Sequence, residues 1–215
     1  MSVHPYIEHL NFLLSIFMVL GVIASSISGA LRAVDSRMDI TGAVLLAFIV
    51  SNAGGTFRDL ILNAPVFWIL HHFYIWLSIG IGAITYLICL FKPQLLTSRR
   101  LTQLLLLTDA LGLGVFCVAG VEKSFLTGQN FSIAIIMGIW TAVGGGVIAD
   151  VIANRVPLVF SSEFYITVAG VGAVLYIILS SFMLHDLAAF IAVNFMLAFR
   201  ILSLKYGWKL PIIKS

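Results

Sequence analysis

Four ionisable side chains stand well inside long apolar stretches of this sequence, namely Arg58, Asp59, Asp109 and Asp150. Each would cost about 2.5–3.5 kcal/mol at the centre of a lipid-facing helix, so each must be paired with another charge or be in contact with water. Acidic residues at membrane depth are typical of cation pathways. We therefore expect the three aspartates to line such a pathway, while Arg58 either lines it or clamps the surrounding helices together.

Two of these aspartates follow a glycine cluster by one helical turn, so that each shares a helix face with the last glycine of its cluster. Glycine costs about 1 kcal/mol in a helix interior, and a cluster favours a break or kink. Backbone carbonyls opened in this way must face protein or water, and they can replace the hydration water of a cation. The alternative is close helix packing through small residues. The predicted breaks or hinges are Gly54 with Gly55, and Gly144 with Gly145 and Gly146.

Other polar residues give weaker signals. Ser26 and Ser28 either line a polar path in the first apolar segment or bond to their own helix backbone. Glu122 and Lys123 follow the fourth segment and form either a solvated pair at the rim or part of a pore entrance. Arg200, in the last segment, is expected to reach the membrane surface along its aliphatic stem.

Motifs of enzymes and of metal or cofactor sites are missing from the sequence. It contains no nucleophile elbow, phosphate-binding loop or dinucleotide fingerprint. Cys89 and Cys117 lie inside apolar segments, without the spacing of a metal site. The basic residues lie between apolar segments rather than in one patch, which disfavours a nucleic-acid partner. We expect no enzyme, no cofactor, and no metal beyond transient monovalent cations.

The elements that must position these side chains are membrane-spanning helices. Of the 215 residues, 61% are hydrophobic and 10% are charged, against roughly 25% charged in a soluble domain. Seven apolar segments approach the roughly 20 residues that a helix needs to cross a bilayer. They are Leu10 to Ala33, Ile40 to Asn63, His72 to Phe91, Leu101 to Gly120, Phe131 to Asn154, Phe164 to Met183, and Leu187 to Lys205. The sequence thus predicts an all-α membrane protein with a single transmembrane domain over residues 1–215.

An internal repeat appears when the sequence is shifted by 91 residues against itself. The aligned pairs include Gly54-Gly55 with Gly145-Gly146, Asp59 with Asp150, Asn63 with Asn154, and Phe73-Tyr74-Ile75 with Phe164-Tyr165-Ile166. Each copy holds three segments, so the second copy must enter the membrane from the opposite side. We predict two inverted three-helix repeats at about 10–91 and 101–183, with a seventh helix at about 187–205, and a pathway between the two copies.

The repeat also predicts the partner of Arg58. Adjacent residues on a helix point about 100° apart, so no direct pair between Arg58 and Asp59 is expected. An axis relating the two copies favours a contact of Arg58 with Asp150 or Asp109 instead.

The basic residues near the segment ends set the predicted orientation, because Lys and Arg accumulate on the cytoplasmic side. One side carries Arg32, Arg37, Lys92, Arg99, Arg100, Arg155, Lys205, Lys209 and Lys214. The other side carries Lys123. We therefore predict a multi-pass protein of the inner cell membrane, with its N-terminus outside and its C-terminus in the cytoplasm. The first segment is longer than the apolar part of a signal peptide, and we interpret it as a retained helix.

Three motifs in this sequence are those of a known family. They are Gly54-Gly55-Thr56-Phe57-Arg58-Asp59 followed by Pro65-Val66-Phe67-Trp68, the run Asp109-Ala110-Leu111-Gly112-Leu113-Gly114-Val115-Phe116, and Gly144-Gly145-Gly146 with Asp150 and Pro157. The chain resembles the prokaryotic branch of the trimeric intracellular cation (TRIC) channel family, which overlaps with bacterial glycine-transporter-like membrane proteins. The resemblance implies a homotrimer with one pathway for K+ and Na+ through each protomer, glycine-kinked second and fifth helices, and lipid in crevices of the assembly.

Two positions depart from the family pattern. Ala149 stands where the second repeat of the family often has an arginine, and Met18 where the first helix often has an aspartate matching Asp109. The leading hypothesis is a passive channel for monovalent cations. Its main alternative is a secondary transporter of a small zwitterion such as glycine, and a third is a structural membrane protein whose buried charges are fully paired and dry.

Overall fold

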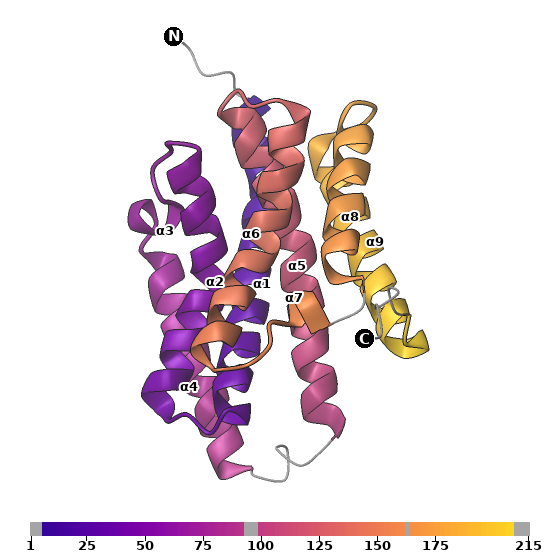
Figure 1. Ribbon diagram of the computed structural model, residues 1–215. Coiled ribbons are helices and arrows are strands. Elements are labelled where there is room, and N and C mark those ends of the chain that lie inside the picture. Colours follow the sequence, from indigo (N-terminus) through magenta and orange to yellow (C-terminus); the bar gives the residue numbers. More distant parts are fainter. Residues whose placement is uncertain (1–5, 93–98, 162–163, 209–215) are drawn as a thin grey trace.

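The computed structural model describes residues 6–92, 99–161 and 164–208, and these residues form helices without any strand (Figure 1). Lys209 and Lys214, which contribute to the predicted orientation, lie outside the described residues. The elements are α1 (Tyr6–Asp35), α2 (Ile40–Ile61), α3 (Phe67–Leu70), α4 (Phe73–Phe91), α5 (Arg99–Leu126), α6 (Phe131–Ile152), α7 (Leu158–Ser161), α8 (Tyr165–Ser180) and α9 (His185–Tyr206).

Six helices in the described residues are long and apolar enough to cross a membrane, which confirms an all-helical membrane protein. They are α1, α2, α4, α5, α6 and α9. The helix α8 is also apolar, but it has 16 residues and is shorter than the six. The helix α5 continues beyond the predicted end at Gly120 to Leu126, and Glu122 and Lys123 lie on its last turns.

The helices α1, α5 and α6 occupy the middle of an elongated bundle (Figure 1). The helix α1 packs against α2 and α4 on one side and against α5 on the other, while α9 and α8 cover α5. One apolar cluster fills the space among α5, α6, α8 and α9, and a second joins α1, α2 and α6. Of the charged side chains predicted to lie in the membrane, Asp109 is on α5 and Asp150 on α6, whereas Arg58 and Asp59 are on α2.

Local structure recurs at the 91-residue interval of the sequence repeat. The bounds of α2 and α6 correspond residue for residue at this interval, and so do those of α3 and α7. The carboxylate of Asp39 caps α2 by accepting the N–H of Gly42, and the side-chain oxygen of Asn130 caps α6 by accepting that of Ile133.

The segments that follow these two helices also match. Asn63 has a φ of 50° and Asn154 a φ of 52°, in the left-handed region that asparagine tolerates better than most residues. Asn63 follows α2 and Asn154 follows α6, so both helices end in the same kind of turn.

The glycine clusters do not break their helices, so the predicted breaks are wrong, while a hinge at either cluster stays a prediction. The helices α2 and α6 are continuous through Gly54-Gly55 and Gly144-Gly145-Gly146. A side chain at Gly54 would collide with the carbonyl oxygen of Thr141 on α6, and one at Gly145 with that of Val50 on α2. Gly54 and Gly145 therefore permit close packing of α2 on α6. This packing explains the two glycines without any opened backbone carbonyl.

Candidate functional site

A buried charge cluster joins the three central helices. Arg32 of α1 places Nη2 2.7 Å from Oδ1 of Asp109 on α5, and Nε 3.0 Å from Oδ1 of Asp150 on α6. Arg32 is 1% exposed, Asp150 3% and Asp109 6%. A buried ion pair is tolerated only when its remaining hydrogen-bonding groups are also satisfied. We call Arg32, Asp109 and Asp150 the central cluster.

Neighbouring groups satisfy the remaining oxygens of the central cluster. The hydroxyl of Tyr165 donates to Oδ2 of Asp109 at 2.6 Å, and the backbone N–H of Leu158 donates to Oδ2 of Asp150 at 3.0 Å. Ser28 accepts a hydrogen bond from Nη1 of Arg32 and donates one to Oδ1 of Asp109 at 3.4 Å. The two carboxylates therefore use all four oxygens and are fixed in position.

The two candidate serines have different roles. Ser28 bonds to two members of the central cluster, whereas Ser26 donates to the carbonyl of Val22 in its own helix at 2.6 Å. Both side chains are fully buried. Of the two alternatives for these serines, bonding to the helix backbone holds for Ser26. Ser28 contacts the charged residues, and its place in a polar path stays a prediction.

Arg32 is the charged residue of the candidate site that the sequence analysis missed. It lies near the end of the first apolar segment and was therefore counted with the basic residues of the cytoplasmic side. Its spacing of four residues from Ser28 was the available signal, because residues four apart share a helix face and Ser28 was already a candidate. The structure places the Arg32 guanidinium inside the bundle.

The predicted contact of Arg58 with Asp150 or Asp109 is wrong. Nε of Arg58 lies 2.8 Å and Nη2 lies 2.7 Å from Oδ1 of Asp59, the residue that follows it on α2. The long arginine side chain can bend back to a neighbour despite the angle between the two Cα–Cβ bonds. Its guanidinium carbon also lies 5.9 Å from the ring centre of Phe67, a cation–π contact that favours this bent conformation.

The two acids of the repeat bind the same backbone position. Oδ2 of Asp59 accepts the N–H of Phe67 at 2.9 Å, as Oδ2 of Asp150 accepts that of Leu158. Phe67 and Leu158 are the first residues of α3 and α7. Each carboxylate thus holds the next short helix, and its other oxygen binds a guanidinium. The guanidinium comes from the same helix for Asp59 and from α1 for Asp150.

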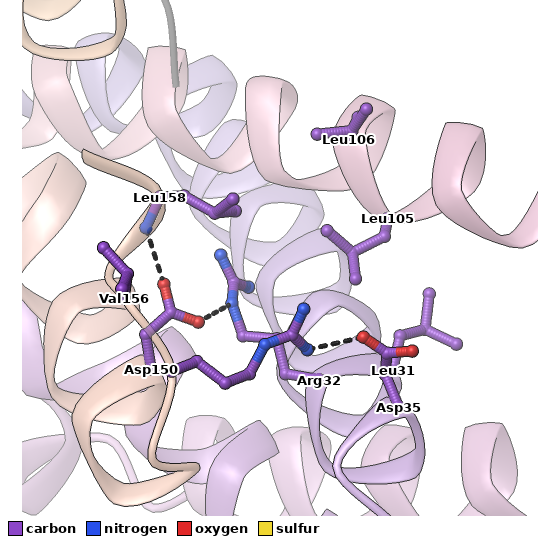
Figure 2. A pocket seen from close by; sticks show the side chains of 9 residues that line it. Leu31, Arg32, Asp35, Leu105, Leu106, Asp150, Val156 and Leu158 are labelled. Atoms are coloured by element: carbon purple, nitrogen blue, oxygen red, sulfur yellow. Dashed lines mark hydrogen bonds and ion pairs between the residues drawn. The ribbon is translucent and has the colours of Figure 1, made fainter. Parts of the chain in front are cut away.

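A cavity of about 140 Å³ reaches the central cluster from one end of the bundle. The buried charges of Arg32 and Asp150 belong to its lining, together with Leu31, Leu105 and Leu158 (Figure 2). A second ion pair borders the same cavity, in which Nη1 of Arg155 lies 2.6 Å from Oδ2 of Asp35. The cavity therefore connects two exposed charges to two buried ones.

Arg200 extends the polar contacts to α9. It is 1% exposed, and its guanidinium carbon lies 4.8 Å from the ring centre of Tyr165, whose hydroxyl binds Asp109. The prediction that Arg200 reaches the membrane surface is wrong, because the aromatic ring holds its charged group inside the bundle.

Glu122 and Lys123 do not form the expected solvated pair. Oε1 of Glu122 lies 2.7 Å from Nδ1 of His185 at the start of α9, and the Glu122 side chain is 13% exposed. A role of Glu122 and Lys123 at a pore entrance stays a prediction. Among the described residues, no group of three or more His, Cys, Asp or Glu side chains is placed to hold a metal ion.

The family of the chain follows from its sequence. The sequence model of the glycine transporter family matches residues 15–89 and again residues 106–181. The starts of these two stretches are separated by the repeat interval of 91 residues. A UPF0126 membrane protein of Vibrio cholerae is 38% identical over 165 residues, which cover 76% of this chain and 67% of that protein. The chain belongs to the glycine transporter family of membrane proteins.

Solved structures with the same fold are TRIC channels. The TRIC channel orthologue from Rhodobacter sphaeroides is 32% identical, with a TM-score of 0.82 over 90% of this chain and 98% of that one. A prokaryotic TRIC channel crystallised in 0.5 M KCl is 30% identical, with a TM-score of 0.84 over 93% of this chain and 100% of that one. These similarities confirm the predicted family resemblance, and the neighbours are ion channels rather than enzymes.

Proposed function

We propose that this protein is a channel for monovalent cations, K+ and Na+, with one pathway through each protomer of a homotrimer. The observation that carries the proposal is the central cluster, in which two fixed carboxylates share one guanidinium in the middle of an apolar bundle. The likeness of the chain to solved cation channels, over most of the chain's length, supports the same conclusion. The trimeric state of those channels supports the homotrimer.

The central cluster holds a formal surplus of one negative charge, because Asp109 and Asp150 outnumber Arg32. In the described conformation, Arg32 occupies the position between the carboxylates that a permeating cation would take. A cation reaching this point needs Arg32 to move aside, after which carboxylate oxygens and the Ser28 hydroxyl replace its hydration water. The Arg58–Asp59 pair is neutral, and its proposed role is to hold α3 and shape the pathway.

We further propose that the chain crosses the membrane seven times, as two inverted three-helix repeats and a seventh helix, α9. The recurrence of helix bounds, caps and turns at the 91-residue interval supports the repeats. At 1.5 Å per residue, the 16 residues of α8 span about 24 Å, which is slightly less than the hydrocarbon core. An odd number of spans puts the two termini on opposite sides of the membrane, and the basic residues near the segment ends favour an N-terminus outside and a C-terminus in the cytoplasm. Membrane lipid is expected in crevices of the trimer.

A secondary transporter of glycine is the alternative, and one observation favours it besides the family description. A zwitterion needs a cation for its carboxylate and a carboxylate for its ammonium group, and Arg32 and Asp150 offer both at the end of a cavity. The two functions differ in whether ions flow continuously through an open pathway.

Recordings from purified protein in planar bilayers under a KCl gradient test the proposal. Discrete currents that reverse near the K+ equilibrium potential are the expected result. Absence of conductance, together with saturable glycine uptake into liposomes, would establish the transporter instead. Liposomes lacking the protein provide the control for both measurements.

A further inference from the structure

The cavity below the central cluster has a dry end and a wet end. At the dry end, the side chains of Arg32 and Asp150 are 2% and 4% exposed. At the wet end, those of Arg155 and Asp35 are 37% and 53% exposed, and both residues line the cavity. Asp35 and Arg155 are the exposed charged residues that line this cavity, and we call them the mouth pair.

The mouth pair joins two parts of the chain that belong to different repeats. Asp35 is the last residue of α1, and Arg155 lies in the turn after α6. The backbone N–H of Arg155 donates to the carbonyl of Asp150 at 2.8 Å, and the same turn supplies the Leu158 N–H that binds the Asp150 carboxylate. A displacement of Arg155 is therefore transmitted directly to Asp150.

Repeat one has no equivalent of the mouth pair. At the 91-residue interval, Asp35 corresponds to Leu126 and Arg155 to Ala64, neither of which carries a charge. The neighbourhood of Asp59 and that of Asp150 are otherwise alike in their turns and hydrogen bonds. The mouth pair is thus a feature of one end of the bundle.

We propose that the mouth pair regulates cation entry from this end, which rests on the proposed channel function. While Arg155 is bound to Asp35, its guanidinium neutralises the carboxylate at the mouth of the cavity. When the pair separates, the free carboxylate raises the local concentration of cations at the mouth. Because both side chains are partly exposed, the pair is weak and salt-sensitive, and its removal should change entry by about two- to five-fold.

Single-channel K+ recordings of charge variants test the proposal. Arg155→Gln leaves Asp35 free and should raise the K+ current entering from this end by about two- to five-fold at about 0.1 M KCl. Asp35→Asn leaves an unpaired cation at the mouth and should lower it. The reversed pair, Asp35→Arg with Arg155→Asp, should restore a current near that of the unmodified protein. All differences should shrink at about 1 M KCl, where the Debye length is about 3 Å.

Lys92→Gln is the matched control, because it removes an exposed positive charge that follows α4 and does not line the cavity. A similar increase in Lys92→Gln and Arg155→Gln would show a general surface-charge effect and overturn the proposal. So would equal currents in the two single variants of the mouth pair.

A second measurement is independent of conduction. Leu105 lines the cavity, and a cysteine introduced there, with Cys89 and Cys117 replaced by alanine, reports access of a cationic methanethiosulfonate reagent. Arg155→Gln should accelerate its modification about two- to five-fold. Faster modification without any K+ current would reject the channel function and support the mouth pair as an entry latch. An unchanged modification rate would overturn the latch.

Discussion

The two acidic turns of this protein have the same backbone but different counter-ions. Asp59 is neutralised by Arg58 on its own helix, whereas Asp150 is neutralised by Arg32 from α1. The pair at Asp59 can move as a rigid part of α2. The pair at Asp150 separates whenever α1 shifts relative to α6. The comparison teaches that an acid repeated in sequence becomes sensitive to helix movement only where its partner lies on another helix.

Packing explains why the second turn has no arginine of its own. Ala149 occupies the position equivalent to Arg58, and it is fully buried in the apolar cluster of α1, α2 and α6. The cluster surrounds it with small side chains such as Ala33 and Ala30. A guanidinium at this position would have to enter that buried apolar cluster, and the counter-charge for Asp150 comes from Arg32 instead.

Replacing each acid by asparagine gives the largest expected effect on this comparison. Asp150→Asn turns an acceptor into a group that also donates, and it faces two donors, Arg32 and the Leu158 N–H. Breaking a buried pair costs about 3–5 kcal/mol, and the loss of the fixed charge should lower K+ conductance at least about tenfold in bilayer recordings. Asp59→Asn should destabilise the protein similarly but reduce conductance less.

Asp39→Asn is the control for these two variants, because asparagine caps a helix as well as aspartate does and Asp39 is exposed. It should leave both conductance and thermal stability unchanged. Equal losses of conductance in Asp59→Asn and Asp150→Asn would remove the proposed distinction between the two turns.

A methyl group at the contact of the two acidic helices should give a smaller effect. Gly145→Ala would place Cβ against the Val50 carbonyl and push α6 away from α2, at a cost of about 1–3 kcal/mol. Gly80→Ala, on α4, meets nothing within 4 Å and should leave stability unchanged or raise it by up to about 1 kcal/mol. Thermal unfolding in detergent compares them, and a Gly145→Ala variant as stable as Gly80→Ala would contradict the close packing of α2 on α6.

The smallest effect should come from the serines of α1. Ser28→Ala removes a hydroxyl that bonds to both Arg32 and Asp109, so Arg32 should leave the carboxylates more readily. A loss of about 1 kcal/mol corresponds to about a fivefold change in open probability. Ser26→Ala removes only a bond to its own helix and should leave gating unchanged. Identical open probabilities in the two variants would show that Ser28 has no part in gating by the central cluster.

Much of the fold could be predicted from the sequence, because length and hydropathy alone define membrane helices. The 91-residue repeat also located the two acidic turns and aligned Asn63 with Asn154, which share a left-handed backbone. The short helices α3 and α7 were not predicted, since four residues are too few to show a periodic pattern.

The partners of the charged residues could not be predicted, because partner choice depends on side-chain conformation and on helix rotation. Arg58 was expected to reach the other repeat, but its side chain bends back to Asp59. Arg32 was read as a surface charge, since the sequence does not show how deeply α1 is buried. The role of the glycine clusters could not be predicted either, because close helix packing and a helix break both favour glycine.

The bond from each aspartate to the first residue of the next short helix has a consequence for how this protein can vary. Glutamate has the same charge as aspartate but is longer by one methylene group, so it would overshoot the N–H of Phe67 or Leu158. Each position therefore requires the length of aspartate, which fits the loop, as well as its negative charge. The side chains of Arg32 and Arg58 bind carboxylate oxygens rather than the backbone of these loops, so they are not bound by the same limit on length.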